Sequence, residues 1–275
     1  MAKRLPAAKR ARRPNPRANR NVEDNIIAFS SFEQNTRNRN GNTRTRRDNQ
    51  RHPENEIFKP KKLELIPRNL AQEEYLDALY DETNSIVFAM GPAGTGKTML
   101  CTQFAIKGLL EGRFKKIIIT RPAVSVDESH GYLPGTLIEK LAPWVVPIMD
   151  VFKEVYPVSV LEKMMKEEII EISPLAYMRG RTFKNACVIA DEMQNATPSQ
   201  MKMLLTRIGD ESRLFITGDL RQHDRGFECN GMWDFTERLR KTVSNSIEVC
   251  EFGPGDVERH PVIEEILRIY DREVE

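Results

Sequence analysis

The stretch Ser85-Ile-Val-Phe-Ala-Met-Gly-Pro-Ala-Gly-Thr-Gly-Lys-Thr98 decides the fold of this chain. Its first six residues form a short apolar run, which predicts a buried strand. The last eight match the pattern G-x-x-x-x-G-K-[ST], in which glycines let the backbone turn its N–H groups toward phosphate oxygens. A helix is expected to follow through Gln103–Leu110 and to point its positive end at the same phosphates. The order strand, loop, helix therefore predicts a phosphate-binding loop (P-loop) in an α/β sheet.

Two side chains of the loop have separate expected roles. Lys97 should reach the β- and γ-phosphates of a nucleotide, and the Thr98 hydroxyl should coordinate Mg²⁺. A glycine-rich loop without a ligand is the alternative, but the strand before the motif and the helix after it favour nucleotide binding. The expected nucleotide contacts in the loop are Gly91, Pro92, Ala93, Gly94, Thr95, Gly96, Lys97 and Thr98.

Apolar runs alternate with helical patterns on both sides of the loop. Further strands are predicted at Lys116–Thr120, Ile169–Ile172, Ala186–Ala190, Arg213–Thr217 and Ser246–Glu251. Helices are predicted at Leu70–Tyr80, Ser199–Ile208, Gly231–Arg240 and Val262–Tyr270, and residues 133–168 are mainly helical with breaks at Pro143, Pro147 and Pro157. Buried strands that alternate with helices indicate a mainly parallel sheet covered on both faces.

Carboxylates follow two of these strands. Asp191 and Glu192 end the run Ala186–Ala190, and ligands of open α/β sheets bind at the carboxyl ends of strands. We expect Asp191 to hold Mg²⁺, directly or through water, and Glu192 to polarise the attacking water as general base. Asp219 and Gln222 follow another strand and are expected to sense the terminal phosphate and help to place the water. Strands that merely run into solvated polar loops are the alternative in both cases.

The amino-terminal part differs from the rest in composition. Residues 1–52 hold 14 Lys and Arg against 4 Asp and Glu, whereas the remainder holds 28 against 36. This arginine- and asparagine-rich part has few apolar residues, so we expect a disordered tail over 1–58 and one folded domain over 59–275. Clustered arginine suits contact with nucleic-acid phosphates. A solvated tail without a partner is the alternative.

The sequence also indicates where the protein works. No apolar run is long enough for a membrane span, and the basic start is not followed by the apolar core of a signal peptide. The four cysteines show no C-x-x-C pairing, so we expect reduced thiols and no structural zinc. These features predict a cytoplasmic protein.

Taken together, the motifs closely resemble the PhoH family of P-loop ATPases, which is related to superfamily 1 helicase cores. The resemblance covers residues 60–272. Beyond the P-loop it rests on Thr120-Arg-Pro122, Gly131-Tyr-Leu-Pro-Gly135, Pro174-Leu-Ala-Tyr-Met-Arg-Gly-Arg-Thr182, Asp191-Glu-Met-Gln-Asn195, Gln200-Met-Lys-Met203, Leu205-Thr-Arg-Ile-Gly209, Ile216-Thr-Gly-Asp219 and Asp256-Val-Glu-Arg-His-Pro261. It implies a RecA-like core, binding of ATP with Mg²⁺, and a role in RNA metabolism in bacteria or their phages.

The resemblance also implies roles for single residues. Gln72 would read the adenine edge, although a surface glutamine on a helix is the alternative. Thr120 and Arg121 look like the helicase segment that touches single-stranded nucleic acid; otherwise Arg121 pairs with an acid. An arginine must also neutralise charge on the transferred phosphoryl group, from the same or a neighbouring subunit. The candidates are Arg179, Arg181, Arg207 and Arg259.

Three functions are compatible with these residues. The first is a Mg²⁺-dependent ATPase that acts on RNA or single-stranded DNA. Larger relatives carry an additional nucleic-acid-binding or nuclease module, which the segment before residue 60 is too short to form. With one motor core, unwinding would require a homo-oligomeric ring such as a hexamer.

The second function is a nucleotide-gated switch with slow hydrolysis, which Glu192 disfavours. The third is a small-molecule kinase, whose lid would lie within residues 123–185.

Overall fold

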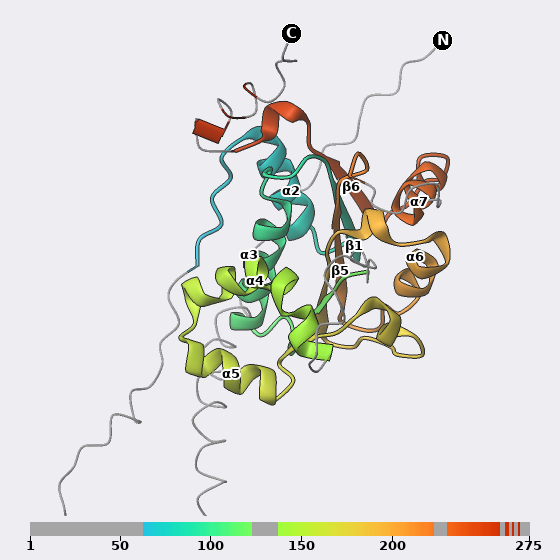
Figure 1. Cartoon of the computed structure of the whole chain (residues 1–275). Coiled ribbons are helices and arrows are strands. Elements are labelled where there is room, and N and C mark those ends of the chain that lie inside the picture. The colour runs from blue at the N-terminus through green and yellow to red at the C-terminus, as the bar shows by residue number, and fades with distance from the viewer. Residues whose placement is uncertain are drawn as a thin grey trace, which may run out of the picture. The chain divides into compact units, whose positions relative to one another are not determined.

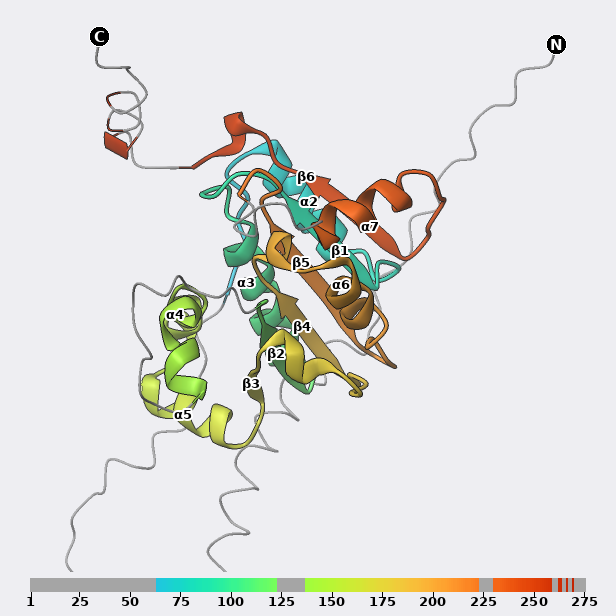
Figure 2. The ribbon, with the colours of Figure 1, turned by 45° about the vertical axis from the view of Figure 1, so that its right-hand side comes forward.

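The computed structural model describes residues 63–122, 137–222 and 230–258, together with Val262, Ile263, Ile266 and Ile269; within 137–144 it describes the backbone alone. In this part of the chain, one sheet of six strands has the order β3-β2-β4-β5-β1-β6, and every neighbouring pair is parallel (Figure 2). The strands are β1 (Ile86–Met90), β2 (Lys116–Thr120), β3 (Ile170–Ile172), β4 (Ala186–Ala190), β5 (Arg213–Gly218) and β6 (Ile247–Glu251).

Helices cover both faces of this sheet. In Figure 1, α3 lies on one side of the strands, and α6 and α7 lie on the other. The helices are α2 (Leu70–Tyr80), α3 (Lys97–Leu110), α4 (Leu137–Val155), α5 (Val158–Lys166), α6 (Pro198–Leu205) and α7 (Gly231–Leu239). Short 3₁₀ turns are η3 (Leu175–Met178), η4 (Met193–Asn195) and η5 (Pro254–Asp256).

The apolar strands are buried because both of their faces are packed. Phe88 of β1 stacks on Phe235 of α7, with ring centroids 5.5 Å apart. Phe215 of β5 meets the ring edge of Phe104 of α3, also at 5.5 Å, on the other face. All five residues of β1 and of β4 are buried, as expected for parallel strands between two helical layers. The predicted α/β fold with a parallel, RecA-like sheet is therefore confirmed.

Two predicted helix boundaries are wrong. Helix α4 runs from Leu137 to Val155 through Pro143 and Pro147, so neither proline ends it. Each proline removes one backbone hydrogen bond, but a buried apolar face of α4, which includes Phe152 (0% exposed), holds the helix against the core. Only Pro157 separates two helices, α4 and α5.

Helix α6 also ends earlier than expected. It begins with a capping box at Thr197 and stops at Leu205 rather than at Ile208. Beyond it, the Arg207 carbonyl accepts a hydrogen bond from the Phe183 N–H, and Ile208 pairs with Phe183 as an isolated bridge. Pairing with the chain before β4 replaces the last helical turn. The expected helix over Val262–Tyr270 and the tail over 1–58 lie outside the continuously described residues.

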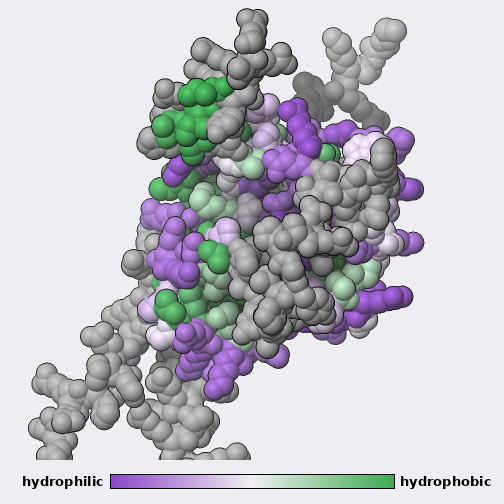
Figure 3. Space-filling view, viewed as in Figure 1, coloured by the Kyte–Doolittle hydropathy of each residue, from purple (hydrophilic) through white to green (hydrophobic). Residues whose placement is uncertain are grey.

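The surface of the described part is mainly hydrophilic on the side shown in Figure 3, with apolar residues in separate groups. None of the helices described by the structure is both long and apolar enough to cross a membrane.

Candidate functional site

The P-loop connects β1 to α3 and depends on glycine at three positions. Gly91, Gly94 and Gly96 have φ angles of 146°, 86° and 81°, in the region that L side chains rarely adopt. A Cβ on Gly96 would lie 3.0 Å from the Gln72 side-chain nitrogen, and one on Gly91 would overlap the Phe252 carbonyl. Glycine thus provides both the turn of the loop and the close approach of two other segments.

Lys97 is the first residue of α3, and its amine lies inside the loop. Nζ donates to the carbonyl oxygens of Gly91 (2.7 Å) and Pro92 (2.6 Å) and to the Thr95 hydroxyl (3.0 Å). Burial lowers the pKa of Lys97, an effect opposed by the carboxylates of Asp219, Glu192 and Asp191. The Lys97 cation among the backbone groups of the loop is suited to bind an anionic ligand, whereas the three carboxylates near it are suited to bind a metal cation.

Three oxygen-bearing side chains meet next to Lys97. The Thr98 hydroxyl donates to Asp191 Oδ1 at 2.8 Å, and the Thr217 hydroxyl donates to the same oxygen at 2.6 Å. They meet because β5, which carries Thr217, lies between β1 and β4 in the sheet. Mg²⁺ usually takes one or two carboxylates, with water and substrate phosphates as its other ligands. One carboxylate with two hydroxyls fits that preference, and the described residues hold no cluster of three or more His, Cys, Asp or Glu that suits a metal.

Glu192 is in a strained conformation directly after Asp191. Its φ of 54° and ψ of 38° are left-handed, which non-glycine residues adopt at a cost and often at functional sites. Its Oε2 accepts a hydrogen bond from Gln194 Nε2 at 2.6 Å and lies 3.9 Å from the guanidinium of Arg121. The carboxylate therefore has two partners from different parts of the chain.

Gln194 links Glu192 to the end of β5 and was given no role by the sequence. Its side chain is 1% exposed, and its Oε1 accepts a hydrogen bond from the Asp219 N–H at 3.2 Å. Asp219 is buried and accepts a bond from the Arg221 N–H, whereas Gln222 is exposed and donates its N–H to the Asp219 carbonyl. Asp191, Glu192 and Asp219 thus meet at one edge, with Gln222 at its surface.

Gln72 is buried beside the P-loop rather than exposed on its helix. Its Nε2 donates to the Thr95 carbonyl at 3.1 Å, and its Oε1 accepts from the Arg68 N–H at 2.9 Å. With 1% of the residue exposed and both ends of the amide bonded to protein, Gln72 supports the loop backbone in this arrangement. The alternative of a surface glutamine is wrong, and contact with adenine stays a prediction.

The segment after β6 lies against the P-loop, a neighbour that the sequence did not reveal. The Phe252 N–H donates to the Met90 carbonyl at 2.7 Å, and the Glu258 N–H donates to the Gly94 carbonyl at 2.9 Å. Asn69, the N-cap of α2, donates its side-chain amide to the Asp256 carbonyl at 3.2 Å. Segments more than 180 residues apart along the chain therefore border the same loop.

Thr120 and Arg121 differ in their access to a partner. Thr120 is 0% exposed at the end of the internal strand β2, so its side chain does not reach the surface, and its contact with nucleic acid stays a prediction. Arg121 is partly exposed and pairs with Glu192. Pairing with an acid was the alternative for Arg121, and it is the one that the structure contains.

The candidate arginines lie in different places. Arg207 is bonded to the chain before β4, whereas Asp191 follows β4; the two ends are roughly 20 Å apart, so Arg207 cannot serve the site of its own subunit here. A role for Arg207 at a neighbouring subunit's site stays a prediction. Arg181 forms a bidentate pair with Glu171. Arg259 lies outside the described residues.

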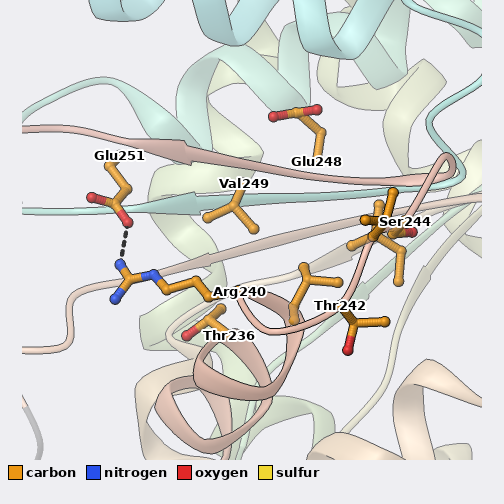
Figure 4. Close-up of a pocket in the computed structure, with 10 residues that line it drawn as sticks. Thr236, Arg240, Thr242, Ser244, Glu248, Val249 and Glu251 are labelled. Atoms are coloured by element: carbon orange, nitrogen blue, oxygen red, sulfur yellow. Dashed lines mark hydrogen bonds and ion pairs between the residues drawn. The ribbon is translucent and has the colours of Figure 1, made fainter.

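A pocket of about 340 Å³ lies between α7 and β6 (Figure 4). Arg240 crosses one end of it and donates to Glu251 at 2.5 Å. None of the predicted nucleotide or metal contacts lines this pocket. The candidate site is therefore not this pocket but the end of the sheet at which the strands have their carboxyl ends.

Comparison with known proteins agrees with these motifs. The family model for PhoH-like protein matches residues 64–271. The PhoH-like protein of Bacillus subtilis (strain 168) is 44% identical over 221 residues, which cover 80% of this chain and 68% of that protein. The PhoH-like protein of Mycobacterium tuberculosis (strain ATCC 25618 / H37Rv) is 41% identical over 209 residues, and Protein PhoH of Escherichia coli (strain K12) is 40% identical over 210; each match covers 58% of the relative. This chain belongs to the PhoH family.

Proposed function

We propose that this chain is a Mg²⁺-dependent ATP hydrolase that acts on single-stranded nucleic acid, with RNA as the first candidate. The observation that carries the proposal is the convergence of the Thr98 and Thr217 hydroxyls on one oxygen of Asp191, beside the Lys97 amine. Glu192 lies directly beyond this group. Together these residues provide a cation for phosphates, oxygen ligands for a divalent metal and a carboxylate for water.

The loop and Lys97 would bind the phosphates. The loop glycines keep the backbone in the conformation that aims N–H groups at phosphate oxygens. The Lys97 amine, which now donates to loop carbonyls, would exchange these contacts for the β- and γ-phosphate oxygens. That exchange replaces neutral acceptors by charged ones, which strengthens each hydrogen bond.

Hydrolysis would depend on the carboxylates. Mg²⁺, held by Thr98 and Asp191, would neutralise charge on the β- and γ-phosphates. Glu192 would accept a proton from the water that attacks the γ-phosphorus, while the bond to the β-phosphate oxygen breaks and ADP leaves. Gln194 and Arg121 fix the direction of the Glu192 carboxylate before this step.

Two features support nucleic acid as the partner. Arg121 follows β2 at the same edge as the site and is partly exposed, so a phosphate could reach its guanidinium. Residues 1–52 also carry a large excess of basic residues. Such segments bind nucleic-acid phosphates electrostatically and with strong salt dependence.

The test is steady-state ATP hydrolysis by the wild type and by Glu192→Gln, each with and without single-stranded RNA. We expect RNA to accelerate the wild type and Glu192→Gln to lose turnover while it still binds ATP. Glu162→Gln, which removes an exposed carboxylate from α5, is the matched control and should hydrolyse ATP like the wild type. Turnover that survives in Glu192→Gln would disprove the assigned base.

A nucleotide-gated switch is the second candidate, and one observation favours it. The carboxylate of Glu192 is already engaged by Gln194 and Arg121, which would slow its reaction with water. Tight ATP binding with negligible turnover, with RNA and without it, would support the switch and refute the motor-like ATPase.

A further inference from the structure

Tyr177 is an exposed aromatic side chain on a turn that is otherwise anchored in the core. It lies in η3 and is 61% exposed, whereas Leu175 and Met178 of the same turn are 1% and 0% exposed. Within the described part of the chain, its hydroxyl makes no hydrogen bond. The two buried neighbours fix the backbone, so the ring is presented to solvent from a rigid support.

This turn is attached to the edge of the sheet that carries the candidate site. The Leu175 N–H donates to the Arg121 carbonyl at 3.2 Å, and the Ser173 N–H donates to the Ile119 carbonyl at 3.0 Å. Tyr177 is therefore two residues from a backbone contact with Arg121. Arg121 in turn lies 3.9 Å from the carboxylate of Glu192.

The two arginines that follow this turn differ in whether an acidic partner already binds them. Arg181 is neutralised by its bidentate pair with Glu171. Arg179, two residues after Tyr177, is exposed and makes no ion pair or hydrogen bond with its side chain in the part of the chain that the structure describes. An available guanidinium two residues from an exposed ring can bind single-stranded nucleic acid, through a phosphate and a stacked base.

We propose that Tyr177, Arg179 and Arg121 form a binding surface for single-stranded nucleic acid, in which Tyr177 stacks on a base and the arginines contact phosphates. The inference rests on the proposed function and names the surface through which the nucleic acid would act. Arg121 is shared between this surface and Glu192. A phosphate on Arg121 therefore competes with the carboxylate of Glu192, and this competition connects nucleic-acid binding to hydrolysis.

The experiment uses the full chain and a fluorescent single-stranded oligouridylate, with binding followed by fluorescence anisotropy. Loss of one base–aromatic stack weakens binding by roughly 5- to 150-fold, and we expect Tyr177→Ala to fall in that range. Tyr177→Phe keeps the ring and should bind like the wild type. Trp233→Ala, which removes another exposed aromatic ring (50% exposed, on α7), is the matched control and should bind and hydrolyse like the wild type.

Salt dependence tests the phosphate contact. Arg179→Ala should reduce the slope of log affinity against log salt concentration by about one, because one phosphate contact is lost. Lys241→Ala removes an exposed charge elsewhere and should leave the slope unchanged. The amino-terminal segment is present in every variant, so its own contribution is common to all of them.

The outcomes separate this inference from the proposed function. If the wild type binds RNA and is stimulated by it, but Tyr177→Ala and Arg179→Ala behave in the same way, the surface is wrong and the proposed function stands. If the wild type hydrolyses ATP without any response to RNA or single-stranded DNA, the nucleic-acid part of the proposed function fails, and this surface with it. Weak binding by Tyr177→Ala that Tyr177→Phe restores supports the stack.

Discussion

Gln194→Met tests whether the buried amide orients the proposed catalytic base. Methionine has a similar length and volume, so the substitution removes the hydrogen bonds to Glu192 (2.6 Å) and from the Asp219 N–H (3.2 Å) with little change in packing. A hydrogen bond to a charged group contributes about 1.5–3 kcal/mol, and Glu192 is partly exposed, so the lower end applies. If orientation of Glu192 depends on this bond, kcat should fall by roughly 10-fold or more.

The assay separates orientation from folding. We expect the dissociation constant for ATP to stay within about threefold of the wild type, because Gln194 has no hydrogen bond to the P-loop, while kcat falls. Urea unfolding should show a loss of about 2 kcal/mol, since the Asp219 N–H is left unsatisfied. Gln200→Met is the control: it removes the capping bond to the Thr197 N–H and should lower stability but not kcat. A wild-type kcat in Gln194→Met, together with the expected loss of stability, would refute the reasoning.

Two further changes test other parts of the molecule. Thr217→Val keeps the shape and removes the hydroxyl that donates to Asp191, so the Mg²⁺ concentration for half-maximal hydrolysis should rise several-fold. An unchanged Mg²⁺ dependence would show that this hydroxyl does not help Asp191 to hold the metal. Hydrogen bonding to Arg181 lowers the pKa of Glu171 below its ordinary value of 4.5. Glu171→Gln should therefore cost about 1 kcal/mol of unfolding free energy at neutral pH, and the difference from the wild type should vanish as pH falls through the lowered pKa. Asp210→Asn is the control, because it breaks an ion pair with Lys184 in which the two side chains are 87% and 63% exposed. It should have almost no effect on the free energy of unfolding, at neutral pH or at acidic pH. Equal losses in Asp210→Asn and Glu171→Gln would contradict this distinction.

The local sequence pattern predicted which helices and strands are present better than it predicted where they end. Helix α2 matches its predicted bounds, and the five other predicted strands and β1 all lie in the sheet. Pro143 and Pro147 misled the prediction because the packing of α4 outweighs the local cost of each proline. The end of α6 was misplaced because a contact with Phe183, distant in sequence, competes with the last turn.

The sequence located those residues of the candidate site that belong to short, recognisable motifs. The P-loop, Asp191, Glu192 and Asp219 each follow a strand, and a parallel sheet brings the carboxyl ends of its strands to one edge whatever their order along the chain. Gln194 was missed because an amide within a polar turn has no distinctive pattern. Its role depends on the distances to two groups, and only one of these is a neighbour in sequence.

The sequence by itself determined the fold class and the positions of the glycine-rich loop and of the carboxylates that follow the strands, because each depends on residue type and spacing along the chain. Only the tertiary structure decided that Thr217 reaches Asp191, that Arg121 pairs with Glu192, and that Arg207 lies near the amino end of β4, away from Asp191. The physical reason is strand order. Which strands become neighbours is fixed by packing of the whole core, so contacts between strand ends cannot be derived from any one segment.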